Sequence, residues 1–346
     1  MSEDHGAPPP RANPDLVGHE AAEAALSQSF ASRRLPHALL LSGPRGIGKA
    51  TLAFRLARFV LSSGEEGTLG DMLGGTAAPG LAIPVDSGVF RRVASGGHAD
   101  LLTVERAWDP RRKRLRSEIV VDDAREIGGF LRLTPAEGGW RVVIVDGAEE
   151  MNRNAANSLL KILEEPPRRT LLVLVAHSPG RLLPTIRSRC RHLPLSALPA
   201  ATVRTLLARY RPELDDATGA AVIELAEGSI GRALDLAASR GIELYRTITG
   251  MLARRPGVDP LALHAFADRL ARVDAEDSYR TVEELLRQHL ARQATDAARA
   301  GQRGVAARWA RLRDDIGDEF ARADGLNLDR KQTILSAFFA IDRAAG

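Results

Sequence analysis

The fold of this chain is decided by one stretch, Leu39-Leu40-Leu41-Ser42-Gly43-Pro44-Arg45-Gly46-Ile47-Gly48-Lys49-Ala50-Thr51. An apolar run ends at Gly43 and a helical pattern begins after Gly48, which indicates a strand, a glycine-rich turn and a helix. The frame G-x-x-x-x-G-K from Gly43 to Lys49 is a P-loop. In such a loop, backbone N–H groups and the start of the helix surround a phosphate, and the lysine neutralises its charge.

The position after Lys49 departs from the usual P-loop. A Ser or Thr hydroxyl normally holds Mg²⁺ there, whereas this chain has Ala50, whose methyl group cannot bind a metal. Thr51 follows one place later, about 100° further round the helix axis. The sequence leaves open whether the loop hydrolyses a nucleotide, only holds one, or holds none. The expected phosphate-binding residues are Gly43, Gly46, Gly48, Lys49 and Thr51.

The composition is that of a globular protein with a mild positive charge. The 346 residues are enough for two or three domains, and 48 basic residues against 44 acidic ones give a net charge of +4. That charge permits contact with nucleic acid without requiring it. No apolar run approaches the roughly 20 residues of a membrane span, and the first residues carry no secretion signal. The single cysteine excludes an intrachain disulfide and a cysteine-based zinc site, so we expect a cytoplasmic protein.

Strand and helix patterns alternate over the first two hundred residues. The expected strands are 38–42, 100–105, 140–146, 170–176 and 191–195, and the expected helices are 17–32, 47–61, 121–133, 155–165 and 182–187. Asp122 or Asp123 is expected to cap the third helix, and the glycine-rich residues 62–97 are expected to be an irregular insertion. Alternation of this kind predicts an α/β fold with a mostly parallel five-stranded sheet covered on both faces.

Beyond Pro199 the patterns are helical only. We therefore expect a flexible leader at residues 1–15, a P-loop α/β domain at 16–198, and all-α domains at 199–244 and 245–346. The last domain has amphipathic helices that suit either assembly or an intrachain core.

Asp146 ends the apolar strand at residues 140–146. With a P-loop upstream, a strand-terminal Asp is favoured as the Walker-B residue, which holds Mg²⁺ directly or through water, over a turn or helix-capping residue. A working ATPase of this type usually has a Glu next, to polarise the attacking water, but Gly147 stands there. Glu149 and Glu150 follow, although the turn need not aim either at a phosphate. The replacements at Ala50 and Gly147 together argue against fast hydrolysis.

Other residues have both a functional and an ordinary interpretation. Arg189 lies in Ser188-Arg189-Cys190, between the last two strands. It is either part of a basic surface turn or an arginine finger for a neighbouring subunit's nucleotide. A finger is chemically suitable because a guanidinium matches phosphoryl charge in a forked geometry. Cys190 is expected to be a small buried residue rather than a nucleophile. Residues 17–19 and His37 suit either an adenine pocket or packing, and for the basic cluster at 111–116 a solvated loop is favoured over contact with a nucleic-acid backbone.

Three segments carry a resemblance to a known family. They are residues 35–55, the block 142–167 with its run Asn157-Ser158-Leu159-Leu160-Lys161-Ile162-Leu163-Glu164-Glu165-Pro166-Pro167, and Ser188-Arg189-Cys190. Together they resemble the clamp-loader branch of the AAA+ proteins and, within it, the delta-prime type of subunit of bacterial DNA polymerase III. The resemblance covers about residues 16–244, and the C-terminal helices match only in being helical.

The resemblance implies a AAA+ module at 16–198, a helical lid at 199–244 and a collar at 245–346 that joins subunits into an open ring. The implied partners are delta and gamma/tau subunits in a hetero-pentamer, the sliding clamp and primed DNA, with no membrane. Such a ring uses ATP to load the clamp in DNA replication. Subunits of the delta-prime type generally do not hydrolyse ATP, act as a stator and present the S-R-C arginine, here Arg189, to a neighbouring ATPase subunit.

We therefore expect a non-catalytic or weak ATPase subunit of a DNA-directed DNA polymerase holoenzyme, binding ATP or ADP with Mg²⁺ without fast turnover. Many relatives bind zinc through a cysteine cluster after the P-loop helix, but residues 62–97 have no cysteine, so no zinc is expected. ATPase relatives also carry an Arg where this chain has Gly231, with Arg232 one place away. The alternatives are an active gamma/tau-like ATPase subunit of the loader, or a monomeric P-loop protein that binds nucleotide or DNA.

Overall fold

The computed structural model describes residues 6–63, 80–109, 114–137, 139–238, 241–253 and 257–345. The chain divides into two compact units. The first comprises residues 1–213 with 223–232, and the second comprises residues 214–222 with 233–346. The domain boundaries expected from the sequence, at 198/199 and 244/245, stay a prediction.

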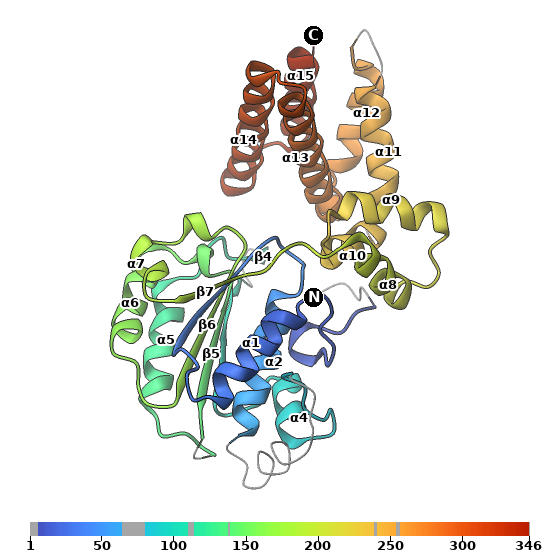
Figure 1. The fold of residues 1–346 in the computed structure, drawn as a ribbon. Coiled ribbons are helices and arrows are strands. Elements are labelled where there is room, and N and C mark those ends of the chain that lie inside the picture. Colours follow the sequence, from blue (N-terminus) through green and yellow to red (C-terminus); the bar gives the residue numbers. More distant parts are fainter. Residues whose placement is uncertain are drawn as a thin grey trace. The chain divides into compact units, whose positions relative to one another are not determined.

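A five-stranded parallel sheet forms the centre of the first unit (Figure 1). Its strands are β1 (Ala38–Ser42), β2 (Leu101–Val104), β5 (Arg141–Asp146), β6 (Thr170–Ala176) and β7 (Arg191–Pro194). They lie in the order β2-β5-β6-β1-β7, and every neighbouring pair is parallel. The predicted α/β class is therefore confirmed. Because β1, β6 and β5 are successive neighbours, their carboxyl ends meet at one edge of the sheet, where open α/β sheets bind ligands.

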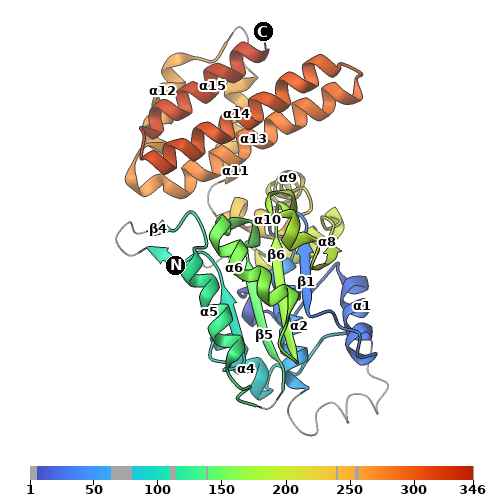
Figure 2. The same cartoon turned by 90° about the vertical axis from the view of Figure 1, so that its left-hand side faces the viewer.

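Helices cover both faces of this sheet (Figures 1 and 2). One layer has α1 (Glu20–Ala31), α2 (Lys49–Ser62) and α4 (Gly88–Ser95), and the other has α5 (Val121–Arg132), α6 (Arg153–Glu164) and α7 (Pro184–Arg187). Alternate residues of β1 serve the two layers, since Leu39 and Leu41 pack in one core cluster and Ala38 and Leu40 in the other. This two-sided burial explains why the strands are continuously apolar in sequence.

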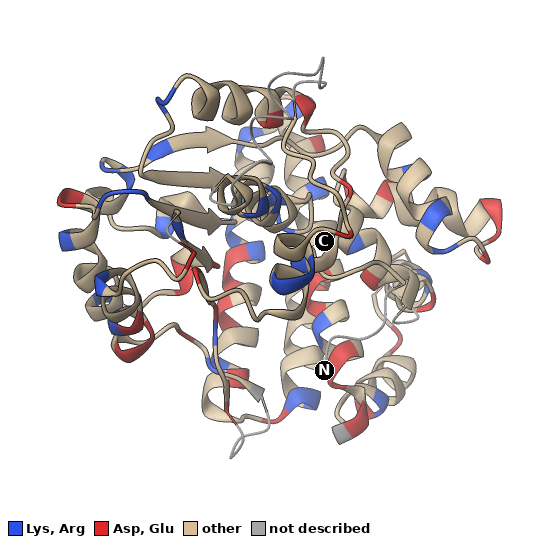
Figure 3. Ribbon diagram, turned by 90° about the horizontal axis from the view of Figure 1, so that it is seen from below, with Lys and Arg blue, Asp and Glu red and all other residues tan. Residues whose placement is uncertain are grey.

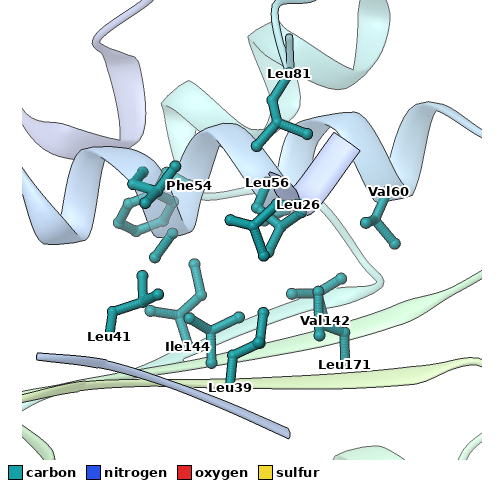
Figure 4. Close-up of a cluster of buried hydrophobic side chains, with 14 of the residues drawn as sticks. Leu26, Leu39, Leu41, Phe54, Leu56, Val60, Leu81, Val142, Ile144 and Leu171 are labelled. Atoms are coloured by element: carbon teal, nitrogen blue, oxygen red, sulfur yellow. The ribbon is translucent and has the colours of Figure 1, made fainter. Parts of the chain in front are cut away.

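The core beneath α2 fixes the start of that helix against the strand ends (Figure 4). Side chains of β1, β5 and β6 face those of α2, and Leu26 of α1 and Leu81 close the cluster. Burying a side chain of this size contributes about 2 kcal/mol. The labelled members are all at most 5% exposed: Leu26, Leu39, Leu41, Phe54, Leu56, Val60, Leu81, Val142, Ile144 and Leu171.

Two local expectations were wrong. The insertion expected to be irregular contains α4, which begins where Ser87 Oγ accepts a hydrogen bond from Phe90 N at 3.2 Å. Flanking glycines concealed this short helix, and residues 64–79 lie outside the described ranges. The N-cap of α5 is Val120, whose backbone N–H donates to Asp123 Oδ2 at 2.9 Å. Asp123 therefore caps from within the first turn of the helix.

The residues before α1 are anchored to α2 by two buried arginines. Arg58 donates to Arg11 O at 2.8 Å and to Asn13 O at 2.7 Å, and burial lowers the pKa of its guanidinium to about 10. Arg55 pairs with Glu23 at 2.5 Å and also donates to the carbonyl of Pro14. These hydrogen bonds attach residues 11–14 to α2, and the flexible leader expected at residues 1–15 stays a prediction.

A small antiparallel hairpin, β3 (Trp108–Asp109) and β4 (Arg114–Leu115), follows β2. Most of the basic cluster at 111–116 lies outside the described residues or side chains. Figure 3 shows Lys and Arg interleaved with Asp and Glu along the helices of the molecule, as the near balance of charges in the sequence suggests.

The rest of the described chain is helical. The helices are α8 (Ala200–Tyr210), α9 (Asp216–Ala226), α10 (Ile230–Ala238), α11 (Gly241–Leu252), α12 (Pro260–Leu270), α13 (Glu276–Arg299), α14 (Arg303–Leu326) and α15 (Arg330–Ala345). In the second unit α13 and α14 form a long hairpin (Figure 2), held partly by contact of the Tyr279 and Phe320 rings at 5.1 Å. In the described ranges, no helix combines the length and apolar character needed to cross a membrane.

Candidate nucleotide-binding site

The P-loop joins β1 to α2 and surrounds the side chain of Lys49. Its glycines, Gly43, Gly46 and Gly48, have φ values of 145°, 74° and 103°. Lys49 is the first residue of α2, and its Nζ donates to Gly43 O at 2.8 Å and to Pro44 O at 2.5 Å. The sequence prediction of a loop between a buried strand and a helix is met by this geometry, with the lysine side chain directed back across the loop.

Burial lowers the pKa of Lys49 to about 8. The charges of Asp146 and Glu149 act in the opposite direction, while Arg45 adds to the lowering. The residue is only 3% exposed, and its hydrogen bonds go to carbonyl groups. A buried ammonium is costly until an anion compensates it. The loop therefore suits a phosphate, whose charge would oppose the effect of burial on this lysine.

His19 supports the loop from the N-terminal segment. Its Nε2 lies 2.7 Å from Ile47 O, and because a carbonyl can only accept, Nε2 carries the proton. His37 Nε2 similarly lies 3.0 Å from Leu163 O. Both histidines named as adenine-pocket candidates thus bond to backbone, and His19 has a place in the site that sequence reasoning did not assign.

The start of α10 contacts the P-loop through a backbone hydrogen bond. Gly231 N donates to Gly46 O at 2.9 Å. A Cβ on Gly231 would lie 2.9 Å from the Cα of Gly46, and a Cβ on Gly46 would lie 2.4 Å from Ser229 Oγ. Neither position accepts a side chain without movement of the other segment. The Arg that the resemblance assigns to ATPase relatives at position 231 would separate these two segments.

The end of β5 has a backbone shaped for glycine. Burial, followed by the charge of Glu105, raises the pKa of Asp146, and Lys49 acts against that rise. Gly147 has φ 75°, and a Cβ there would lie 2.6 Å from Glu150 Oε2. Glu150 Oε2 is itself paired with Arg106 Nε at 2.8 Å. The acid expected of an ATPase at position 147 would therefore meet both backbone strain and an occupied space.

Glu149 ties the end of β5 to the end of β6. Its Oε1 accepts from His177 N at 2.7 Å and from Ser178 N at 3.0 Å. Its Oε2 and the Nδ1 of His177 are buried and have no hydrogen-bond partner among the described residues. Burial lowers the pKa of His177 to about 4, so the imidazole is neutral at physiological pH. Buried polar atoms without partners are uncommon and call for a ligand or water, which again suits a bound polar group.

Neither His177 nor the fixed position of Glu149 was predicted from the sequence. A signal for His177 was present, because it directly follows a buried parallel strand next to the P-loop strand. For a metal, Mg²⁺ usually takes one or two carboxylates together with substrate phosphates, and Asp146 is the predicted residue in that position. Thr51 is buried in α2, 8% exposed. No cluster of three potential ligands occurs among the described residues.

Arg189 lies near the amino ends of the strands, at the opposite end of the sheet from the P-loop. Arg191, at the start of β7, is paired with Leu39 near the start of β1, whereas the P-loop follows the end of β1. Nη2 of Arg189 donates to Glu164 Oε1 at 2.6 Å and Nη1 donates to Thr185 O at 3.0 Å. The structure therefore brings Lys49, Asp146, Glu149 and His177 together and leaves Arg189 apart from them.

Cys190 is half-buried, and burial raises the pKa of its thiol to about 11. A thiol that stays protonated is a poor nucleophile, as expected from the sequence.

Comparison with known proteins matches residues 18–199 to the family model described as DNA polymerase III, delta subunit. A DNA polymerase III subunit gamma/tau of Mycobacterium tuberculosis is 32% identical over 280 residues, which are 79% of this chain and 45% of that protein. A DNA polymerase III subunit delta′ of Pseudomonas aeruginosa is 38% identical over 177 residues, 51% of this chain and 48% of that protein. The chain spans about half the length of these curated relatives.

Among solved structures, a DNA polymerase III gamma subunit-related protein of Thermotoga maritima aligns over 93% of this chain and 100% of its own, with 18% identity and a TM-score of 0.38. The fold assignment rests instead on the sheet order and the family match. Because the family model covers more than half of the chain and the resemblance carried by the P-loop, L-L-K-x-L-E-E-P-P and S-R-C motifs points the same way, this chain belongs to the DNA polymerase III, delta subunit family of clamp-loader proteins.

Proposed function

We propose that this chain is the stator subunit of a DNA polymerase III clamp loader, which holds a nucleotide without fast hydrolysis and supplies Arg189 to a neighbouring ATPase subunit. The observation that carries the proposal is the placement of Lys49 and Arg189 at opposite edges of the sheet. The five residues of β1 span about 15 Å. Arg189 is thus remote from the phosphate loop of its own chain and available to another subunit.

The proposed assembly is a hetero-pentamer with delta and gamma/tau subunits that acts in the cytoplasm on the sliding clamp and primed DNA. Residues 16–198 would be the AAA+ module, 199–244 the lid and 245–346 the collar through which subunits associate. The names of the relatives, which are subunits of one polymerase, support membership of such a complex.

The proposed nucleotide is ATP or ADP, whose phosphates would lie in the loop formed by Gly43, Gly46, Gly48 and Lys49, with Thr51 and Asp146 toward the metal. When bound, the nucleotide would supply an anion in direct contact with Lys49, whose hydrogen bonds go to carbonyl groups, and the oxygens that Mg²⁺ needs beyond Asp146. This chain's residues orient it, while Gly147 provides no carboxylate to activate water. The burial of Lys49 and the partnerless atoms of Glu149 and His177 support this assignment.

The arginine finger is tested with Arg189→Ala in the assembled loader. Loss of a finger slows phosphoryl transfer by 10³-fold or more at the site it serves, so that site's share of the ATPase rate should disappear. Arg187→Ala is the matched control, because Arg187 is an exposed arginine of the same turn. Size-exclusion chromatography checks that both variants still assemble. An undiminished rate with Arg189→Ala would contradict the assignment.

Nucleotide binding is tested by titrating the purified chain with ATP and ADP, with and without Mg²⁺. We expect binding in both conditions and less than a tenfold gain from Mg²⁺, because Ala50 cannot bind the metal. Turnover by the isolated chain should be negligible. If the chain bound no nucleotide either with or without Mg²⁺, the nucleotide-holding part of the proposal would fail and only the stator role would remain.

A second candidate is an active ATPase subunit of the gamma/tau type. It is favoured by the 79% coverage of this chain in the gamma/tau match and by the buried, partnerless Oε2 of Glu149 in the site. Turnover by the isolated chain that is lost in both Lys49→Ala and Glu149→Gln would select this alternative. Failure of the chain to join loader subunits during sizing would instead select a monomeric nucleotide-binding or DNA-binding protein.

A further inference from the structure

The guanidinium of Arg189 is held from two sides. Nη2 donates to Glu164 Oε1 at 2.6 Å, and Nη1 donates to the carbonyl of Thr185 at 3.0 Å. Glu164 is the last residue of α6, and Thr185 belongs to α7, which directly precedes the Arg189 turn. The side chains of Arg189 and Glu164 are 35% and 50% exposed. Two different helices therefore set the plane of one exposed arginine.

This pair contributes little to folding. An ion pair exposed to this degree is weak, because water screens the charges and both side chains lose rotamer freedom. A carboxylate in the last turn of a helix also faces the negative end of the helix dipole. Neither the stability of α6 nor that of the fold accounts for a glutamate at position 164. What the pair does achieve is a fixed orientation of Arg189.

The held guanidinium keeps most of its hydrogen-bonding capacity. An arginine has five N–H donors in a planar fork, and Glu164 and Thr185 each accept one of them. Within the described ranges the remaining donors have no acceptor, so they can point toward a phosphate on an adjoining subunit. An arginine whose plane is already set loses less freedom when that phosphate arrives, which is the advantage of preorganised groups in phosphoryl transfer.

We propose that Glu164 is the positioning residue for Arg189, which it holds in the orientation needed to reach a neighbouring subunit's phosphate. The inference rests on the proposed finger role of Arg189. Glu164 acts through the arginine and does not itself contact the nucleotide. Its neighbour Glu165 carries the same charge in the next position but takes no part in the pair, and so provides a matched control.

The test compares Glu164→Ala, Glu164→Gln and Glu165→Ala in the assembled loader by steady-state ATPase kinetics. Glu164→Ala should lower kcat three- to tenfold and leave KM for ATP unchanged, because the finger acts in the transition state. Glu164→Gln should retain most of the rate, since its amide oxygen still accepts from Nη2. Glu165→Ala should match the unmodified loader. Combined with Arg189→Ala, Glu164→Ala should cause no further loss, as expected of two residues that act as one unit.

The inference is overturned if Glu164→Ala leaves kcat unchanged or raises it, the latter meaning that the pair stores the arginine away from its target. Additive losses in the double variant would also overturn it. Thermal melting of each variant, which should be unchanged, separates these results from misfolding. If Arg189→Ala has no effect on the rate, the proposed finger itself fails. If Arg189→Ala lowers the rate and Glu164→Ala does not, only the positioning role fails.

Discussion

The carboxyl ends of β1 and β5 lie at the same end of one sheet. They differ in which residues of a working ATPase they keep. At the end of β1 the P-loop has its glycines and a buried Lys49. At the end of β5 the acid of a working ATPase is replaced by Gly147, and Glu150 occupies the adjacent space. In the proposed function, binding of phosphate and activation of water would therefore depend on different strand ends. A chain can lose the second ability while the first is preserved.

The largest effect is expected from removing the P-loop lysine at the end of β1. Lys49→Ala should weaken ATP and ADP binding on the order of 100-fold, because it removes a charge-assisted hydrogen bond that a buried ammonium would make to phosphate. A fluorescent-nucleotide titration measures the change, and Lys161→Ala, at an exposed position of α6, is the control. Unchanged affinity in Lys49→Ala would mean that the loop does not bind the phosphates.

A smaller effect is expected from introducing the missing acid at position 147, at the end of β5. Gly147→Glu should leave ATP turnover negligible and lower the free energy of unfolding by about 1–3 kcal/mol. The reason is the φ of 75° and the 2.6 Å approach of any Cβ to Glu150 Oε2. Chemical denaturation measures the loss, with Gly180→Ala as the control, because a Cβ at Gly180 meets open space. Turnover gained without loss of stability would show that the end of β5 can still accept the acid.

The strands that lead to the site could be predicted from the sequence where both faces of the strand are buried. Strand β6 was expected at 170–176 and occupies Thr170–Ala176, because a strand covered on both faces is a continuous apolar run between turn signals. The P-loop was recognisable since its residue spacing follows from the loop's own chemistry. Helix α4 was missed because its apolar residues lie among glycines, which usually mark loops.

The contacts that define the site could not be read from the sequence. Glu149 meets the start of the segment after β6, Gly231 meets Gly46, and Glu164 meets Arg189, each across a long separation in the chain. Such pairs depend on how layers pack, and no local period or spacing encodes them. From the sequence, Gly231 was noted only because ATPase relatives have an arginine at that position. In the structure its backbone contacts Gly46, and a side chain at position 231 would prevent that contact.

The smallest effect follows from the pKa of Lys49, which burial lowers to about 8 in the chain without ligand. A bound phosphate favours the charged ammonium and raises that pKa, so binding above pH 8 takes up a proton. Nucleotide affinity should therefore be constant below about pH 7 and fall by up to about tenfold per pH unit above pH 8. Titrations between pH 6.5 and about pH 9.5 measure the slope.

Lys49→Ala is the matched control for this slope, because it removes the group that titrates and should bind weakly at every pH. If the same slope persisted in Lys49→Ala, the proton would belong to another group. His177, whose pKa is lowered to about 4, is already neutral throughout this range and does not contribute. The pH dependence is thus a property of the end of β1 alone, and Gly147→Glu at the end of β5 should leave it unchanged.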